Sequence, residues 1–338
     1  MLTLAFHPDG GHLLSGGFGG IRRWQLQPNS DGQQVGNKTY AVYAISVSRN
    51  HRWIVYGTDD GASVWDEVMD EKVFDVEGKI GVWAVDVSPD STRFATGTTR
   101  KEASIWSMTT AQRLVGPLTQ DGWVNGLRFS PTGEYIATAC LDGKSIGIFD
   151  SHGGDKLVTL NTAHTSGGVA VPLAWSGDAR QVFAASGLKI TAFDVSTGSQ
   201  IAESQIFNGG IIHSIALAPN GKFIATFASH SIWLLDTSTL ARIHPIIENS
   251  KEIRSISISP DNSCLATGDL QKIIIRDLGR ILPDSYGPFP VSIHSCKPYS
   301  VSHADKLYRY LLAMQYNKTM SGLWHRAAPT PKHLTLPR

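Results

Sequence analysis

The stretch WVNGLRFSPTGEYIATACLDGKSIGIFD, residues 123–150, decides the fold of this 338-residue chain. Apolar residues alternate with polar or small ones over 123–129 and again over 145–150, which is the period-two pattern of a half-buried strand. A Ser-Pro-Thr-Gly segment and an Asp-Gly pair supply the backbone angles of two tight turns. With further strands over 135–138 and 156–160, the stretch predicts one small antiparallel sheet of four strands.

The same unit recurs seven times along the chain. Each unit has an apolar anchor in its first strand, and successive anchors lie 40 to 46 residues apart. A bulky residue that usually precedes Asp follows each anchor after 20 to 22 residues, as in Trp65-Asp66 and Phe149-Asp150. The anchors are Leu4, Ile45, Val85, Leu127, Leu173, Ile215 and Ile256. A fixed period of this length predicts one supersecondary unit that repeats until a ring closes.

The repeated pattern V-x-F-S-P-D-G, then a small residue with Gly, then apolar-x-apolar-Trp-Asp, resembles the WD-repeat (WD40) β-propeller family over residues 1 to about 280. The resemblance implies an all-β, seven-bladed β-propeller of four-stranded antiparallel blades. Units rich in S-P-D-G are also loosely similar to the WD arrays of fungal NACHT-type incompatibility proteins. The first turn is degraded at 48–51 and 176–179, and the family's Gly-His pair is missing from most units. We therefore expect the blades to depend on apolar packing more than on that polar network.

The propeller is expected over 1–296, followed by a basic C-terminal tail over 297–338. The tail carries seven Lys and Arg against one Asp, so its charge is +6 and the rest of the chain is 1 − 6 = −5. The pattern predicts one helix over 305–316 and disorder after it. Because the chain starts on an inner strand, the outer strand of the last blade must come from the C-terminal side, with 290–294 favoured, or be absent. That start also fits a fragment of a longer array.

Charge, hydropathy and cysteine content together favour a location inside the cell and no contact with a membrane. The net charge of +1 gives no argument for nucleic acid or an anionic membrane. There is no signal peptide, and no apolar run approaches the 18 residues that span a bilayer. Cys140, Cys264 and Cys296 share no paired spacing, and the first two are expected to be free, buried thiols. This fits a reducing compartment, cytoplasmic or nuclear.

Motifs that resemble catalytic sites fall in the wrong places. The Gly-x-Ser-x-Gly match at 143–147 lies in a predicted hairpin, whereas a nucleophile elbow needs a strand-to-helix turn. The Ser-x-x-Lys match at 186–189 lies in the corresponding turn of the fifth unit. The twelve His show no metal-binding spacing, and the Asp residues at strand ends are expected to bond turn backbone. We therefore predict no catalytic residue, metal site or cofactor.

One set of residues predicts a binding surface. Two residues before each anchor, the repeat reaches the rim of the channel, on the face that the family resemblance assigns to binding. Those positions hold Leu2, Tyr43, Trp83, Asn125, Val171, His213 and Arg254. Trp123 lies on the same loops, and Tyr, Trp and Arg often carry about 2 kcal/mol or more each in interfaces. The predicted partner-binding rim is Tyr43, Trp83, Trp123, Asn125, His213 and Arg254; local loop packing is the alternative for each.

These observations predict a non-enzymatic scaffold that binds a protein or peptide at the channel mouth, as a monomer or within a larger complex. Three alternatives stay open. A lactonase-type propeller enzyme would need carboxylates or His converging on a metal in the channel. The resemblance also allows a sensor fragment of a larger NACHT-WD signalling protein. A nucleic-acid reader would use the basic tail and bind in a salt-sensitive way, although no nucleic-acid or membrane partner is otherwise expected.

Overall fold

The computed structural model describes residues 2–26, 32–36, 40–141, 145–162, 173–207, 210–287 and 299–302. The chain divides into two compact units, Met1–Ser302 and His303–Arg338. The helix predicted over 305–316 lies outside the described residues. So does the segment 290–294, the favoured candidate for the last outer strand.

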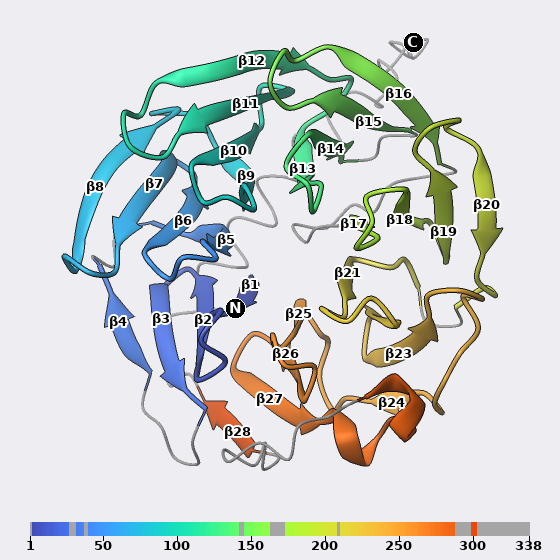
Figure 1. Ribbon diagram of the computed structural model, residues 1–338. Coiled ribbons are helices and arrows are strands. Elements are labelled where there is room, and N and C mark those ends of the chain that lie inside the picture. Colours follow the sequence, from blue (N-terminus) through green and yellow to red (C-terminus); the bar gives the residue numbers. More distant parts are fainter. Residues whose placement is uncertain are drawn as a thin grey trace, which may run out of the picture. The chain divides into compact units, whose positions relative to one another are not determined.

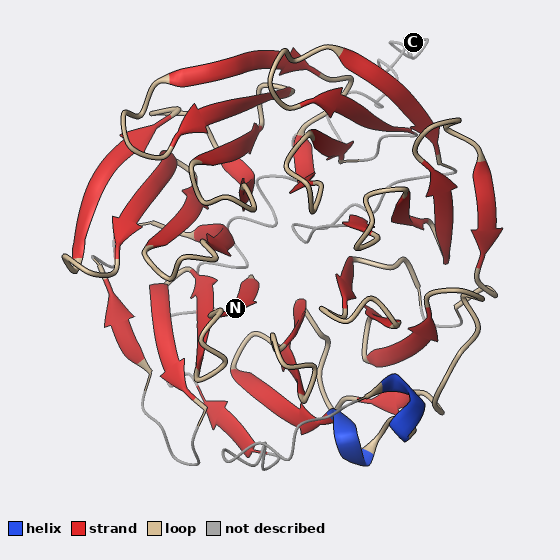
Figure 2. Cartoon of the chain, in the orientation of Figure 1, coloured by secondary structure: helices blue, strands red, loops and turns tan. Residues whose placement is uncertain are grey.

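The first unit is a ring of seven four-stranded antiparallel sheets, or blades, around a central channel (Figure 1). Blades one to four comprise β1 (Thr3–Phe6), β2 (His12–Gly17), β3 (Gly20–Gln25), β4 (Gln33–Val35), β5 (Val42–Val47), β6 (Trp53–Thr58), β7 (Gly61–Asp66), β8 (Glu71–Val76), β9 (Val82–Val87), β10 (Arg93–Thr98), β11 (Glu102–Ser107), β12 (Arg113–Thr119), β13 (Val124–Phe129), β14 (Tyr135–Cys140), β15 (Ser145–Asp150) and β16 (Lys156–Asn161). Blades five to seven comprise β17 (Leu173–Trp175), β18 (Gln181–Ser186), β19 (Lys189–Asp194), β20 (Gln200–Glu203), β21 (Ser214–Leu217), β22 (Phe223–Ala228), β23 (Ser231–Asp236), β24 (Ile247–Glu248), β25 (Ser255–Ile258), β26 (Cys264–Gly268), β27 (Lys272–Asp277) and β28 (Tyr299–Ser302). The described helices are two single 3₁₀ turns, Leu278–Arg280 and Asp284–Tyr286 (Figure 2). The predicted all-β, seven-bladed fold is confirmed.

The ring closes through its last outer strand and through apolar packing. The strand β28 pairs with β27, so residues 299–302, rather than the favoured 290–294, supply the outer strand of blade seven. This strand also lies beyond the boundary expected at 296. On the inner side, Leu4 and Trp24 of blade one share a buried cluster with Ile273 and Ile275 of blade seven. Apolar side chains therefore fill the joint between the first and last blades.

Two blades contain a polar contact between their second and third strands. The Trp24 indole Nε1 donates to Ser15 Oγ at 2.8 Å, and Trp106 Nε1 donates to Thr96 Oγ1 at 2.9 Å. In each case the third strand of a blade bonds the second, so a buried indole N–H has a partner without any His. The apolar packing expected in place of the Gly-His pair is thus supplemented by these Trp-to-hydroxyl bonds.

The seven turns that join the first strand of a blade to its second share one backbone geometry. The fourth residue of each lies in the left-handed region: Gly10 (φ 70°), His51 (63°), Ser91 (61°), Gly133 (77°), Ala179 (58°), Gly221 (72°) and Asn262 (63°). At each position a backbone N–H bonds the carbonyl of the turn's first residue, as from Ala179 to Ser176 at 3.0 Å. The turns that looked degraded at 48–51 and 176–179 therefore keep the geometry, although a left-handed non-Gly residue costs about 1–2 kcal/mol.

The cysteines differ from expectation at one position. Cys140 is a buried free thiol, as predicted. Cys264, buried in β26, is disulfide-bonded. None of the helices within the described residues is long and apolar enough to cross a membrane.

Candidate functional site

The predicted rim residues occur at the beginning of the innermost strands. Tyr43, Trp83 and Asn125 are the second residues of β5, β9 and β13, and His213 and Arg254 directly precede β21 and β25. Every blade repeats the same antiparallel order outward from its inner strand. The beginnings of the inner strands therefore lie on one face of the ring, here called the rim face. The turns from first to second strand lie on the opposite face, the turn face.

In blades two to four the rim position coincides with a β-bulge. The pairing of β5 with β6 skips Tyr43, that of β9 with β10 skips Trp83, and that of β13 with β14 skips Asn125. A bulge leaves the extra residue out of the ladder and changes the direction of its side chain. The irregularity is what releases these three side chains from the regular alternation of their strands.

Three aromatic side chains form a continuous row across these blades. The rings of Tyr43 and Trp83 lie 5.7 Å apart, and those of Trp83 and Trp123 lie 5.2 Å apart in a T-shaped arrangement. Tyr43 is buried, Trp83 is half-buried, and Trp123 is 37 % exposed. We call Tyr43, Trp83 and Trp123 the aromatic row. It runs from the channel wall, which Tyr43 lines, to an exposed indole.

The inner end of the row is fixed by a polar contact. Burial raises the pKa of the Tyr43 hydroxyl, and the hydrogen-bonded Asp59 carboxylate beside it raises that pKa further. The phenol is therefore neutral at every physiological pH and donates a hydrogen bond. Because Asp59 lies in the turn between β6 and β7, this contact orients the ring against its own blade.

His213 and Arg254 form a separate part of the rim. Burial lowers the pKa of His213, and the positive charge of Arg254 lowers it further. The Arg254 side chain is exposed and its Nη2 lies 2.8 Å from Glu252 Oε2. His213 is therefore a neutral, half-buried imidazole at pH 7, with its ring centroid 6.0 Å from that of Phe227. The charge of Arg254 therefore acts on His213 at this part of the rim.

One member of the predicted rim, Asn125, is fully buried, so its side chain is not available to a partner in this conformation. The two remaining positions of the period were not in the predicted rim. Leu2 is half-buried, and residue 171 lies outside the described residues.

Loops on the rim face add apolar surface that the period did not indicate. Leu188, Ile206 and Ile211 are 41 %, 60 % and 48 % exposed. The loop that carries the two Ile residues packs on the β18–β19 turn, where Phe207 N donates to Leu188 O at 2.9 Å. The repeat pattern locates strand positions and is silent about loops between blades. The signal available in the sequence was a pair of Ile residues in a loop that does not follow the repeat.

The channel itself carries few charges. Its volume is about 660 Å³, and its charged side chains among the described residues are Arg49, Asp86 and Arg128. Burial raises the pKa of Asp86 despite Arg128 Nη1 at 3.1 Å and the Phe129 N–H at 2.9 Å. One carboxylate held by an arginine and a backbone donor offers little to a metal. The described channel thus lacks the converging acids or His that a lactonase-type enzyme would need.

The other motifs take the structural places expected of them. Asp66, Asp150, Asp194, Asp236 and Asp277 each accept a bond from turn backbone, as predicted. Ser186 and Lys189 face each other across the β18–β19 hairpin. Ser145 begins β15, while 142–144 lie outside the described residues.

Sequence reasoning overlooked one cluster on the turn face. His7, Asp9 and His12 lie close enough for one ligand atom of each to fall within 4.8 Å of the other two. The signal was present as His-Pro-Asp-Gly-Gly-His in the first turn, an H-x-D-x-x-H spacing that we read only as a turn.

Comparison with known families and proteins agrees with this architecture. Residues 71–107 and 111–150 match the family described as WD domain, G-beta repeat. WD repeat-containing protein 1 of Gallus gallus is 37 % identical over 81 residues, which is 24 % of this chain and 13 % of that protein. Apoptotic protease-activating factor 1 of Homo sapiens is 28 % identical over 186 residues, 53 % of this chain and 14 % of that protein. The latter match gives loose support to the predicted likeness to NACHT-type WD arrays.

A solved structure shares the fold. The Cps50 (Swd1) β-propeller domain of Myceliophteria thermophila superimposes with a TM-score of 0.68 at 16 % identity, covering 82 % of this chain and 96 % of that domain. The chain spans only about an eighth of the curated WD repeat-containing protein 1 sequences that it matches. The likeness therefore concerns the propeller and not the whole of those proteins.

Proposed function

We propose that this seven-bladed β-propeller belongs to the WD40-repeat family and acts as a non-enzymatic scaffold that binds a protein or peptide on its rim face. The observation that carries the proposal is the aromatic row. Three aromatic rings from three consecutive blades touch in sequence at the channel mouth and end in an exposed Trp. Aromatic side chains at the centre of a surface are the commonest carriers of binding energy in protein interfaces.

Other loops of the rim face carry exposed apolar side chains that suit a partner with apolar groups. Leu188, Ile206 and Ile211 are exposed on the same face, and Tyr40, which precedes β5, is 49 % exposed. Exposed apolar groups that gather on one face mark interaction sites more often than scattered ones do. Arg254 is held by Glu252 and would supply a polar contact at the edge of the site.

The experiment changes Trp83 and Arg254 together to Ala. Each residue, as a binding hot spot, would contribute about 2 kcal/mol, roughly 30-fold in affinity. We expect the double variant to lose partners that the unaltered chain captures from the native cell, as measured by quantitative mass spectrometry. Circular dichroism should show an unchanged fold.

The control variant is Leu114→Ala, which removes a 51 % exposed apolar side chain from the outer strand β12, away from the rim. This variant should capture the same partners as the unaltered chain. Normal capture by the folded double variant would show that the binding surface lies elsewhere on the ring.

A further inference from the structure

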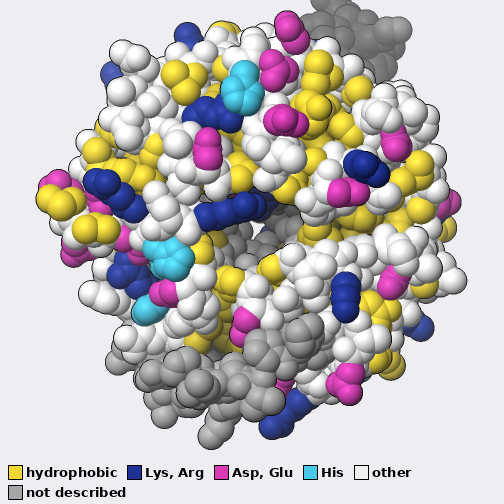
Figure 3. Space-filling view, viewed as in Figure 1, with side chains coloured by type: hydrophobic (Ala, Val, Ile, Leu, Met, Phe, Trp, Pro, Cys, Tyr) yellow, Lys and Arg dark blue, Asp and Glu magenta, His cyan; other side chains and the backbone are white. Residues whose placement is uncertain are grey.

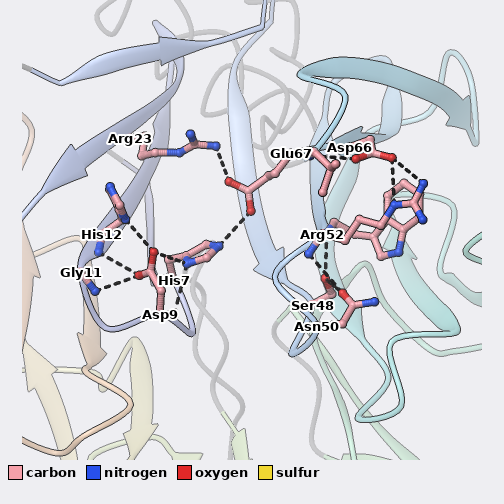
Figure 4. Close-up of polar contacts among 12 residues, drawn as sticks. His7, Asp9, Gly11, His12, Arg23, Ser48, Asn50, Arg52, Asp66 and Glu67 are labelled. Carbon is pink, nitrogen blue, oxygen red and sulfur yellow. Dashed lines mark hydrogen bonds and ion pairs between the residues drawn. The ribbon is translucent and has the colours of Figure 1, made fainter.

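Two imidazoles and one carboxylate converge in the turn between β1 and β2, on the turn face (Figure 4). His7 Nδ1 lies 2.9 Å from Asp9 Oδ2, and His12 Nδ1 lies 2.7 Å from the same oxygen. Figure 3 shows His and acidic side chains next to one another near the joint between the first two blades. His7 is buried, while His12 and Asp9 keep about a third of their side chains exposed, so solvent reaches the cluster.

The two oxygens of Asp9 have different roles. Oδ1 accepts the backbone N–H groups of Gly11 at 2.8 Å and His12 at 3.1 Å, which holds the carboxylate in the turn. Oδ2 faces the two imidazoles. One oxygen of the carboxylate is therefore held by the turn, and the other is directed at two nitrogen ligands.

The second nitrogen of His7 is already engaged. Nε2 lies 2.9 Å from Glu67 Oε2, and Glu67 in turn forms an ion pair with Arg23. A His whose outer nitrogen donates to a carboxylate presents its inner nitrogen as a lone pair, the arrangement that orients and strengthens metal-binding His residues. The Asp9 N–H, 3.2 Å from Nδ1, is consistent with a lone pair there. The 2.9 Å separation between His7 Nδ1 and the Asp9 oxygen requires either a proton or a metal ion between the two atoms.

The cluster is not a requirement of the turn. In the corresponding turns of five other blades, a serine occupies the position of His7: Ser48, Ser88, Ser130, Ser176 and Ser259. The position of His12 is held elsewhere by residues such as Trp53, Arg93 and Gln181. The fold therefore forms this turn without His, and the two imidazoles together with the Glu67 partner are particular to blade one.

We propose that this turn binds one divalent transition-metal ion of the Zn²⁺ class through His7 Nδ1, Asp9 Oδ2 and His12 Nδ1. Two His and one carboxylate suit such ions, and three protein ligands leave a position for water or a partner's group. Tetrahedral Zn²⁺ would need ligand atoms about 3.3 Å apart, so the contacts at 2.7 and 2.9 Å need open only slightly. The ion would join β1 to β2 and, through His7 and Glu67, to the second blade.

The test is calorimetric titration of Zn²⁺ into the whole chain after treatment with a chelator. We expect one equivalent of Zn²⁺ whose binding is lost in Asp9→Asn and in His12→Gln. Both substitutions keep a polar side chain of similar size, and Asn can still accept the turn's backbone N–H groups through Oδ1. Glu67→Gln, which keeps every ligand, should weaken binding by roughly 10- to 100-fold.

Matched controls separate this site from the other His residues. Asp90→Asn alters the same turn position in blade three, and His51→Gln removes an imidazole whose ring lies 5.3 Å from that of His7. Both should bind Zn²⁺ as the unaltered chain does. Zn²⁺ binding that is equal in Asp9→Asn, His12→Gln and Asp90→Asn would overturn the proposal. No stoichiometric binding by the unaltered chain would also overturn it and leave a proton-bridged His–carboxylate network only.

Discussion

The first turns of blades one and three have the same backbone and different chemistry. His7 N donates to His12 O at 3.0 Å, and Ser88 N donates to Arg93 O at 2.9 Å, so the turns close alike. In blade three, Ser88 Oγ lies 2.6 Å from Asp90 Oδ1 and accepts the Arg93 N–H at 2.9 Å. In blade one, the His7 side chain has no oxygen, and the His12 N–H donates to Asp9 Oδ1 instead.

The difference shows how one repeat acquires a property that its neighbours lack. A serine hydroxyl forms hydrogen bonds with polar groups of its own turn, because it can both donate and accept. A histidine at the same place reaches further, so its outer nitrogen meets Glu67 of blade two and its inner nitrogen faces Asp9. The turn of blade one therefore becomes a contact between blades, whereas the serine of blade three serves its own turn.

The largest effect should come from removing the carboxylate that joins the two blades. Glu67→Ala takes away the partner of both His7 and Arg23 in a site where the Glu67 side chain is only 9 % exposed. We expect the free energy of unfolding of the metal-free chain to fall by roughly 3 kcal/mol, because two charge-assisted contacts disappear together. Urea unfolding followed by circular dichroism measures the loss.

The control for that change is Glu203→Ala. Glu203 Oε1 lies 2.6 Å from Lys189 Nζ, and the two side chains are 46 % and 32 % exposed. An exposed ion pair contributes about 0–1 kcal/mol. If Glu67→Ala lowered the free energy of unfolding no more than Glu203→Ala does, the contact between blades one and two would contribute no more than an exposed ion pair.

An intermediate effect is expected when the serine turn is opened. Ser88, a residue that is 1 % exposed, loses its hydroxyl in Ser88→Ala, and the half-buried Arg93 is left without the side-chain acceptor of its N–H. An unsatisfied buried donor costs about 1–3 kcal/mol, and chemical denaturation should show a loss in that range. Ser238→Ala, at an exposed turn position, should change stability by less than about 0.5 kcal/mol. Equal losses in the two variants would contradict the local lock that we assign to Ser88.

Burial explains why the sequence predicted the inner strands so well. Each anchor is a buried residue of an innermost strand, as with Leu127 at 0 % exposed, so its apolar character repeats with the fold. Outer strands face solvent more than inner strands do and carry little alternation. The strand β8 is largely exposed and β24 has two residues, so neither leaves a strong pattern. The outer strand β28, four residues long, was also missed.

The proposed binding surface combines strand positions with loop positions. The period brings Tyr43 and Trp83 to neighbouring places, and the Trp83 ring contacts both Tyr43 and Trp123. The same period selects Asn125, which is fully buried. A period in the sequence places the backbone and does not determine how deeply a side chain is covered. The cluster at His7 was missed because its signal is a spacing within one turn rather than a repeat.

The smallest effect concerns the backbone that the two turns share. Gly10 has φ 70° and a Cβ added there would meet nothing within 4 Å, so Gly10→Ala introduces left-handed strain alone. We expect a loss of about 0.5–1 kcal/mol, since the alanine also restricts the unfolded chain. Gly221→Ala in blade six, with φ 72° and equal space, should lose the same amount, while Gly177→Ala, which meets no such strain, should gain about 0.4–1 kcal/mol. Equal losses at Gly10 and Gly221 in thermal or urea unfolding would locate the whole difference between the turns in their side chains. A much larger loss at Gly10 would show that the His cluster itself depends on this backbone angle, and the separation of backbone from chemistry would fail.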